Sequence, residues 1–175
     1  NPPRKVLSTI LEELRHCDEF YISVAFVTTS GVATLMNTLK DLEEKGVKGK
    51  VIVSQYLNFT QPEALRKLLK FANIELRIAT KENSHSKGYL FRKSEYHNVI
   101  IGSSNLTASA LTTNKEWNLK VSALHSSSIV EKIIGEFDTD FQNGSSVTAS
   151  FIDTYEDIYN KQKILSRAHE EAFIK

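Results

Sequence analysis

A short stretch in the middle of the chain holds residue types that suit the chemistry of a phosphate. His85 and Lys87 are two positions apart, and Ser103 and Asn105 repeat that spacing behind Gly102. Side chains two apart on a strand project from the same face, so each pair points together if both segments are strands. If the two strands are neighbours in one sheet, an imidazole, an ammonium, a hydroxyl and a carboxamide converge at one place. Such a set predicts an anion pocket.

The residue types also predict a reaction. A phosphodiester repels anionic nucleophiles, so a site must neutralise its oxygens and supply a neutral attacking group. Lys87 supplies charge, while Ser103 and Asn105 supply directed donors. A neutral imidazole is a competent nucleophile near neutral pH, and attack by His85 would form a covalent phosphohistidine that water then hydrolyses. Glu116 is predicted to accept a hydrogen bond from the other ring nitrogen and so to fix the tautomer.

The same residues resemble the motif of the phospholipase D superfamily, which is His-x-Lys, four residues, Asp, a short gap and Gly-Ser-x-Asn. Residues 102–105, Gly-Ser-Ser-Asn, match its second block, and the distance from Asn105 to Glu116 resembles that of the superfamily's nuclease branch. The resemblance implies that His85 is the nucleophile. It also implies that Lys87, Ser103 and Asn105 bind the phosphate and that Glu116 orients the imidazole.

The chain departs from the family pattern in two ways. Arg92 stands at the position of the motif's Asp, which resembles the restriction-enzyme and helicase-associated branch more than the lipid enzymes. The chain also contains one motif, whereas in the family two motifs face each other, one histidine attacking and the other protonating the leaving oxygen. The resemblance therefore implies a homodimer with twofold symmetry.

The pattern of elements predicts an α/β sandwich. Strand-like runs at residues 19–27, 47–54 and 74–79 alternate with helical periodicity at 32–45 and 62–72, as a parallel sheet with crossover helices requires. Thr28, Thr29 and Ser30 supply capping residues before the first of these helices, and Gly46 ends it. Residues 85–93 and 96–102 follow with only Ser94 and Glu95 between the strand-like runs, which predicts an antiparallel hairpin. We therefore expect a mixed, largely parallel sheet flanked by helices on both faces, the phospholipase D-like sandwich. Further segments predict a loop or short helix at 105–114, a strand at 117–124, and helices at 126–141 and after 146.

Composition bounds the class of protein. The 175 residues fit one domain, residues 1–175, and a chain that opens at Asn1 and stops in charged helical sequence is expected to be a fragment of a larger protein. No apolar run is long enough to span a bilayer, so no membrane partner is expected. Cys17 is the sole cysteine, which excludes an intrachain disulfide and favours a cytoplasmic setting. The net charge of +1 argues against a surface that is basic all over.

Several residues have simpler explanations. The histidines other than His85 show no spacing typical of metal ligands, so no metal and no cofactor are predicted. Trp117 and Phe91 have the chemistry to stack on bases, but as strand neighbours they are predicted to lie in the core. Arg92 and Lys93 suit contacts to a nucleic-acid backbone, and an ordinary exposed pair explains them as well.

The sequence therefore predicts a metal-independent phosphodiesterase that acts on DNA and is completed by dimerisation. The resemblance implies the nuclease-like module of a restriction enzyme or helicase, with a motor or recognition domain elsewhere in the full-length protein. Two alternatives stay open. One is a non-catalytic DNA-binding or dimerisation module, and the other is a small phospholipid diesterase.

Overall fold

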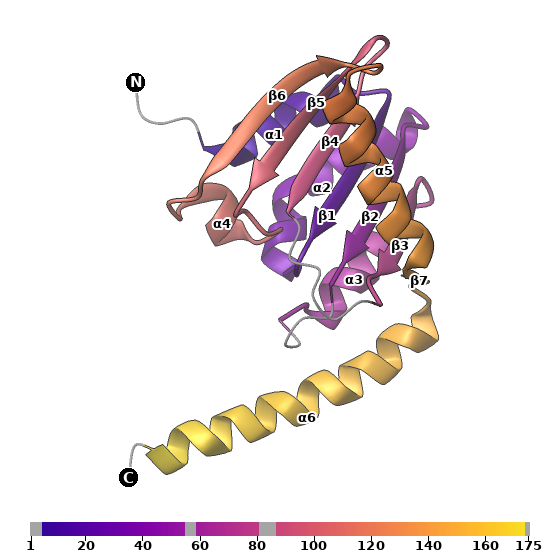
Figure 1. Ribbon diagram of the computed structural model, residues 1–175. Coiled ribbons are helices and arrows are strands. Elements are labelled where there is room, and N and C mark those ends of the chain that lie inside the picture. The colour runs from indigo at the N-terminus through magenta and orange to yellow at the C-terminus, as the bar shows by residue number, and fades with distance from the viewer. Residues whose placement is uncertain (1–4, 55–58, 81–86, 174–175) are drawn as a thin grey trace.

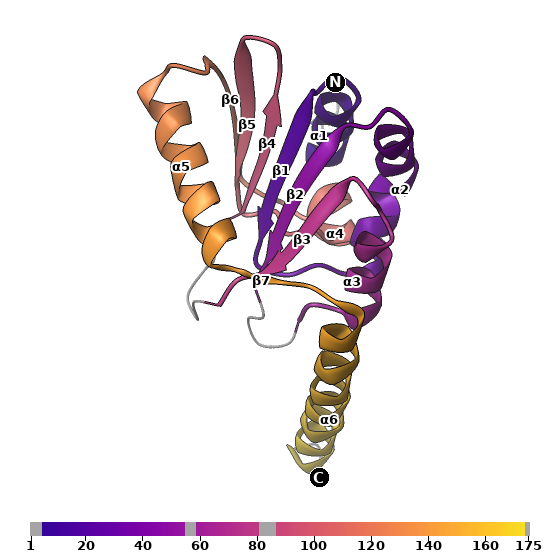
Figure 2. The same ribbon diagram turned by 90° about the vertical axis from the view of Figure 1, so that its right-hand side faces the viewer.

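The computed structural model describes residues 5–54, 59–80 and 87–173, with backbone alone from residue 168 onward. A central sheet carries helices on both faces (Figures 1 and 2). Within the described residues the sheet has seven strands in the order β6-β5-β4-β1-β2-β3-β7. The strands are β1 Glu19–Val24, β2 Lys48–Val53, β3 Ile74–Ile78, β4 Gly88–Arg92, β5 Tyr96–Gly102, β6 Asn118–Leu124 and β7 Ser145–Ser146.

The sheet is mixed, as predicted, but it is not largely parallel. The pairs β1–β2 and β2–β3 are parallel, whereas β1–β4, β4–β5, β5–β6 and β3–β7 are antiparallel. The crossover helices produce the parallel half. β4 already runs antiparallel to β1, the short hairpin after residue 93 reverses the chain into β5, and the strands that follow are also added antiparallel.

The helices divide between the two faces of the sheet. Helices α1 to α4 lie on one face, and α5 lies diagonally across the other (Figure 2). The long helix α6 extends away from the sheet beyond α3 (Figure 1). The helices are α1 Val6–Arg15, α2 Thr29–Glu44, α3 Pro62–Leu69, α4 Ala108–Thr112, α5 Ser128–Asn143 and α6 Ala149–Phe173.

The alternation along β1 shows why both faces need a cover. Phe20, Ile22 and Val24 are buried in the main core beneath α1, α2 and α3. Tyr21 points the other way and packs edge-on against Phe137 of α5, with ring centroids 5.4 Å apart. Apolar residues therefore occur at nearly every position of this strand, as the sequence indicated.

Helix α2 begins and ends at residues that are typical of helix termini. The Thr28 hydroxyl accepts a hydrogen bond from Gly31 N at 3.1 Å and caps the first turn. After Glu44 the chain turns at Gly46, whose φ of 70° lies in the left-handed region that glycine adopts without strain. Both signals were legible in the sequence.

A buried charge network joins α1 to the sheet. The Glu13 carboxylate lies 3.2 Å from Lys93 Nζ, accepts a 2.7 Å hydrogen bond from Asn98 Nδ2, and also binds Lys120. Burial by itself raises the pKa of Glu13, but the hydrogen bonds from Asn98, Lys120 and Lys93 outweigh it, so the pKa is lowered. The sequence allowed Lys93 to form an exposed pair with Arg92. In the structure Lys93 is instead buried as a counter-ion of Glu13.

We expect the substitution Glu13→Gln to lower the free energy of unfolding by about 3–5 kcal/mol, because it leaves a buried ammonium without its counter-ion. The lowered pKa also predicts the pH dependence. The contribution of Glu13 is complete above its ordinary pKa of 4.5 and is lost as the pH falls below that value. Urea denaturation between pH 3 and pH 7 measures both effects. The exposed variant Glu44→Gln is the control, and equal stability of the two variants would contradict the assignment.

Trp117 corrects a second expectation. It was predicted to lie in the core, yet 88% of its surface is exposed. Trp117 directly precedes β6, which lies at the edge of the sheet, so only one neighbouring strand flanks it. Phe91, by contrast, is fully buried, as expected. Among the described residues, no helix combines the length and the apolar character that crossing a bilayer requires.

Candidate active site

The two strands that carry the motif are neighbours, as predicted. β4 and β5 pair antiparallel, with Gly88 opposite Ile101. One step further, Gly102 N donates a 3.2 Å hydrogen bond to the carbonyl oxygen of Lys87. Lys87 therefore lies directly across from the start of the Gly-Ser-Ser-Asn block. His85, the predicted nucleophile, lies outside the described residues.

Asn105 joins the ends of β1 and β5. Its side-chain oxygen accepts hydrogen bonds from Ala25 N at 3.0 Å and Phe26 N at 3.3 Å. Because both partners are backbone donors, the orientation of the amide is fixed, and its NH₂ group is the part left to face a ligand. Asn105 is itself buried. A donor held this firmly suits a preorganised anion site.

Ser103 and Glu116 form a pair beside Asn105. The Ser103 hydroxyl donates to a carboxylate oxygen of Glu116 and accepts a 3.1 Å hydrogen bond from Trp117 N. The backbones of the two segments are also paired, since Ser103 N donates a 3.0 Å hydrogen bond to the carbonyl oxygen of Trp117. In this arrangement the hydroxyl proton points at Glu116, so Ser103 positions the carboxylate and offers no proton to a phosphate unless the hydroxyl rotates.

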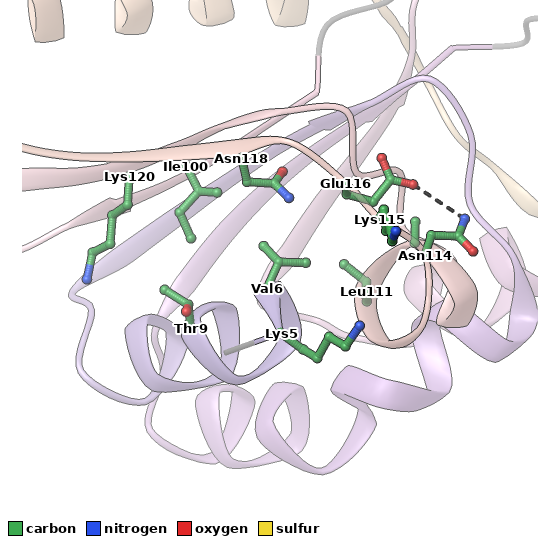
Figure 3. Close-up of a pocket in the computed structure, with 11 residues that line it drawn as sticks. Lys5, Val6, Thr9, Ile100, Leu111, Asn114, Lys115, Glu116, Asn118 and Lys120 are labelled. Carbon is green, nitrogen blue, oxygen red and sulfur yellow. Dashed lines mark hydrogen bonds between the residues drawn. The ribbon is translucent and has the colours of Figure 1, made fainter. Parts of the chain in front are cut away.

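Glu116 keeps acceptor capacity after these contacts. Its other oxygen receives a 3.4 Å hydrogen bond from Asn114 Nδ2 (Figure 3). A carboxylate has about four acceptor sites, so two described partners leave room for an imidazole N–H. The Glu116 carboxylate also affects Tyr89. The pKa of Tyr89 is raised mainly by burial and further by the negative charge of Glu116. Tyr89 thus stays protonated and donates a 3.1 Å hydrogen bond to the carbonyl oxygen of Ser104.

Gly102 is required by the close approach of β6. A Cβ atom at this position would lie 2.0 Å from the carbonyl oxygen of Trp117 and 2.4 Å from Asn118 Oδ1. A side chain here would push β6 away and take Glu116 with it. The glycine of the motif therefore has a packing reason as well as a place in a sequence pattern.

Ser103, Asn105 and Glu116 line one hollow of about 320 Å³, called here the motif hollow. Sequence reasoning missed the other polar residues around it, which are Thr28, Ser30, Thr107, Ser109 and Asn114. Thr28 caps the 16-residue helix α2, so the partial positive charge of that helix end lies beside the hollow. Its cap signal was visible in the sequence, but nothing in the sequence indicated that the helix begins at the site.

Lys87 does not line the motif hollow. It borders a separate hollow of about 230 Å³ on the α5 side of the sheet, together with Ser23, Leu90 and Phe137. Of the residues predicted to converge, the structure thus brings Ser103, Asn105 and Glu116 together and places Lys87 next to them along the backbone. Within the described part of the chain, no three His, Cys, Asp or Glu side chains are grouped to hold a metal ion.

Fold and site together define an α/β domain with a polar hollow between two strand ends. The family model described as "Cardiolipin synthase, PLD-like domain" matches residues 10–142. The chain belongs to this phospholipase D-like family. The assignment to the phospholipase D superfamily that was made from the motif is confirmed.

Solved structures share the fold at low identity. Nuc from Salmonella typhimurium, described as a phospholipase D family member, has a TM-score of 0.61 and 19% identity, covering 81% of this chain and 90% of its own. NucT from Helicobacter pylori has a TM-score of 0.62 and 17% identity, covering 81% and 91%. TrmBL2, an archaeal chromatin protein described as having a novel mode of DNA binding, has a TM-score of 0.51 and 15% identity, covering 82% and 53%. No curated protein matches the sequence.

Proposed function

We propose that this domain is a metal-independent nuclease that hydrolyses DNA through a covalent intermediate on His85. The observation that carries the proposal is the fixed orientation of Asn105, whose amide donor faces a hollow that it shares with Glu116. Phosphodiester hydrolysis needs donors aimed at the phosphoryl oxygens before the reaction begins. The family membership and the Asn105-to-Glu116 spacing support the same chemistry.

The proposed reaction has two displacements. A ring nitrogen of His85 attacks phosphorus, a P–N bond forms, and the P–O bond to the leaving nucleotide breaks. The histidine of a second copy donates a proton to that oxygen. Water then attacks the phosphohistidine, giving up a proton to the second histidine, and the P–N bond breaks. Glu116 holds the imidazole, and Asn105 stabilises the charge on the phosphoryl oxygens. The family motif implies the same role for Lys87, whose backbone pairs with Gly102 beside the motif hollow.

Two other candidate functions have a specific observation behind them. The DNA-binding description of TrmBL2 favours a module that binds DNA without cleaving it. The name of the matched family favours a small phospholipid diesterase. A shared fold does not choose among them, since function depends on the site.

One experiment separates the three functions. The purified domain is incubated in EDTA with labelled plasmid DNA and, separately, with phosphatidylcholine micelles. We expect nicking or linearisation of the plasmid that survives chelation, with no release of choline. Tight DNA binding without cleavage would replace the nuclease with a binding module. Release of choline without DNA cleavage would make the domain a lipid enzyme.

The proposed dimer has a surface to support it. Ile101 and Leu119 lie opposite each other on β5 and β6, and they are 45% and 67% exposed. Trp117 continues this apolar strip to the edge of the motif hollow, beside Ser103 and Glu116. Exposed apolar strips of this kind mark contact surfaces. A second copy seated here would lie next to the site that it is proposed to complete.

We expect Leu119→Asp to convert a dimer to a monomer and to abolish cleavage, because two carboxylates would face each other across the twofold axis. Sedimentation velocity measures the first effect and plasmid cleavage the second. Leu165→Asp, at a similarly exposed leucine on α6, is the matched control and should change neither. A wild-type domain that sediments as a monomer at high concentration yet still cleaves DNA would defeat the proposal.

By resemblance, we also propose that the full-length protein adds a helicase or DNA-recognition domain and acts in the cytoplasm.

A further inference from the structure

A second hollow adjoins the motif hollow on the side of α1 and has no role in the proposed reaction. It measures about 350 Å³ and lies between α1, α4, β5 and the edge strand β6 (Figure 3). Asn114 and Glu116 line both hollows. A ligand can therefore reach from one hollow to the other past Glu116. This volume falls in the range typical of small-molecule sites.

The lining of this hollow has two chemical parts. Its apolar lining comes from Val6, which is half-buried, and from Ile100 and Leu111, which are buried. Its rim carries three ammonium groups, from Lys5, Lys115 and Lys120, and we call it the lysine hollow. In Figure 3, Lys5 and Lys115 lie on the side nearest Glu116, and Lys120 lies at the far end.

The positive charge of the rim is only partly compensated by its neighbours. Lys120 is paired with Glu13, which also binds Lys93. Lys5 donates to the backbone carbonyl of Thr113 at 3.4 Å, a neutral acceptor that leaves the charge in place. Glu116 is the one carboxylate among the lining residues and already accepts from Ser103 and Asn114. Lys5 and Lys115 thus provide the positive potential nearest the site.

We infer that the lysine hollow binds the nucleotide next to the scissile phosphate, with the phosphate of that nucleotide held by Lys5 and Lys115. This inference rests on the proposed nuclease function. It identifies the feature of the site that would favour a polymeric substrate. A polynucleotide carries a phosphate on every nucleotide. The phosphate next to the scissile one can therefore bind in the lysine hollow, which adjoins the motif hollow. A phospholipid with a single phosphate has nothing to place there.

The test compares a polymeric and a small substrate. The double variant Lys5→Ala/Lys115→Ala is assayed in EDTA on a fluorescent single-stranded oligonucleotide and on bis(4-nitrophenyl) phosphate. We expect KM for the oligonucleotide to rise about tenfold or more at moderate salt. The slope of log binding constant against log salt should fall by about 1 for each lysine removed. The kcat/KM for the small diester should stay unchanged. Lys45→Ala/Lys70→Ala removes two exposed lysines elsewhere and should match the wild type.

Each outcome decides the inference. An unchanged KM and salt slope would overturn it, and so would an equal loss on both substrates, which indicates damage to the catalytic residues. Loss of phosphatidylcholine hydrolysis without loss of oligonucleotide binding would assign the hollow to a lipid and overturn it as well. If the wild type cleaves no substrate, the nuclease proposal fails, while oligonucleotide binding followed by fluorescence anisotropy still tests the hollow. Weaker binding by the double variant then supports it.

Discussion

Replacing His85 with alanine is expected to lower the rate of DNA cleavage by at least about 10⁴-fold, because the variant lacks the nucleophile of the proposed covalent step. DNA binding should persist, since Lys87, Asn105 and the lysine hollow are unchanged. The measurement is single-turnover cleavage of a labelled duplex in EDTA, with binding followed in parallel by fluorescence anisotropy. Persistence of binding with loss of cleavage separates a catalytic role from a folding defect.

The matched control for this experiment is His16→Ala. His16 is an exposed histidine at the end of α1, and its ring contacts the Glu12 carbonyl oxygen at 2.8 Å. Its removal should leave cleavage unchanged. Wild-type rates in the His85→Ala variant would refute the assignment of the nucleophile, whatever the fate of the control.

Asn105→Asp is expected to abolish cleavage and leave the fold intact. An aspartate oxygen still accepts the hydrogen bonds from Ala25 N and Phe26 N, so the two strand ends stay joined. The NH₂ donor, however, becomes a carboxylate oxygen that repels the phosphate. We expect a loss of at least about 10²-fold in kcat, the effect typical of removing one preorganised donor, with a melting temperature close to that of the wild type.

Asn105→Ala provides the contrast. It removes both functions, leaves the buried Ala25 N–H and the half-buried Phe26 N–H without their acceptor, and should lower the free energy of unfolding by about 2–3 kcal/mol. Thermal melts and cleavage assays on the two variants together separate the structural role of the oxygen from the binding role of the nitrogen. An active Asn105→Asp variant would show that the amide donor does not contact the substrate.

The fold followed from local signals wherever those signals were strong. Apolar runs marked the parallel strands, Thr28 marked the start of α2, and the short link at Ser94 and Glu95 marked the hairpin. The predominance of antiparallel pairs could not be derived, because sequence shows which segments are strands but not how they are ordered. β7 was missed because its two residues are too short to show any alternation.

The site was predictable in its residue types and less so in their contacts. The two-residue spacing correctly indicated that Ser103 and Asn105 share a hollow. The attachment of Asn105 to the end of β1 spans about 80 residues of sequence and leaves no local signal. Trp117 shows the same limit, because a strand pattern does not reveal that the strand lies at an edge. Lys93 was misjudged because its partner, Glu13, lies on a helix 80 residues earlier.

Detection of the covalent intermediate is the most direct test of the proposed mechanism. The wild-type domain is mixed with an equimolar short oligonucleotide in EDTA and quenched in alkali, which preserves a phosphohistidine, and its peptides are analysed by mass spectrometry. We predict a nucleotidyl adduct on the peptide that contains His85, present in the wild type and absent from His85→Ala. Rapid cleavage with no adduct at any time point, or an adduct on a different side chain, would contradict the proposed mechanism.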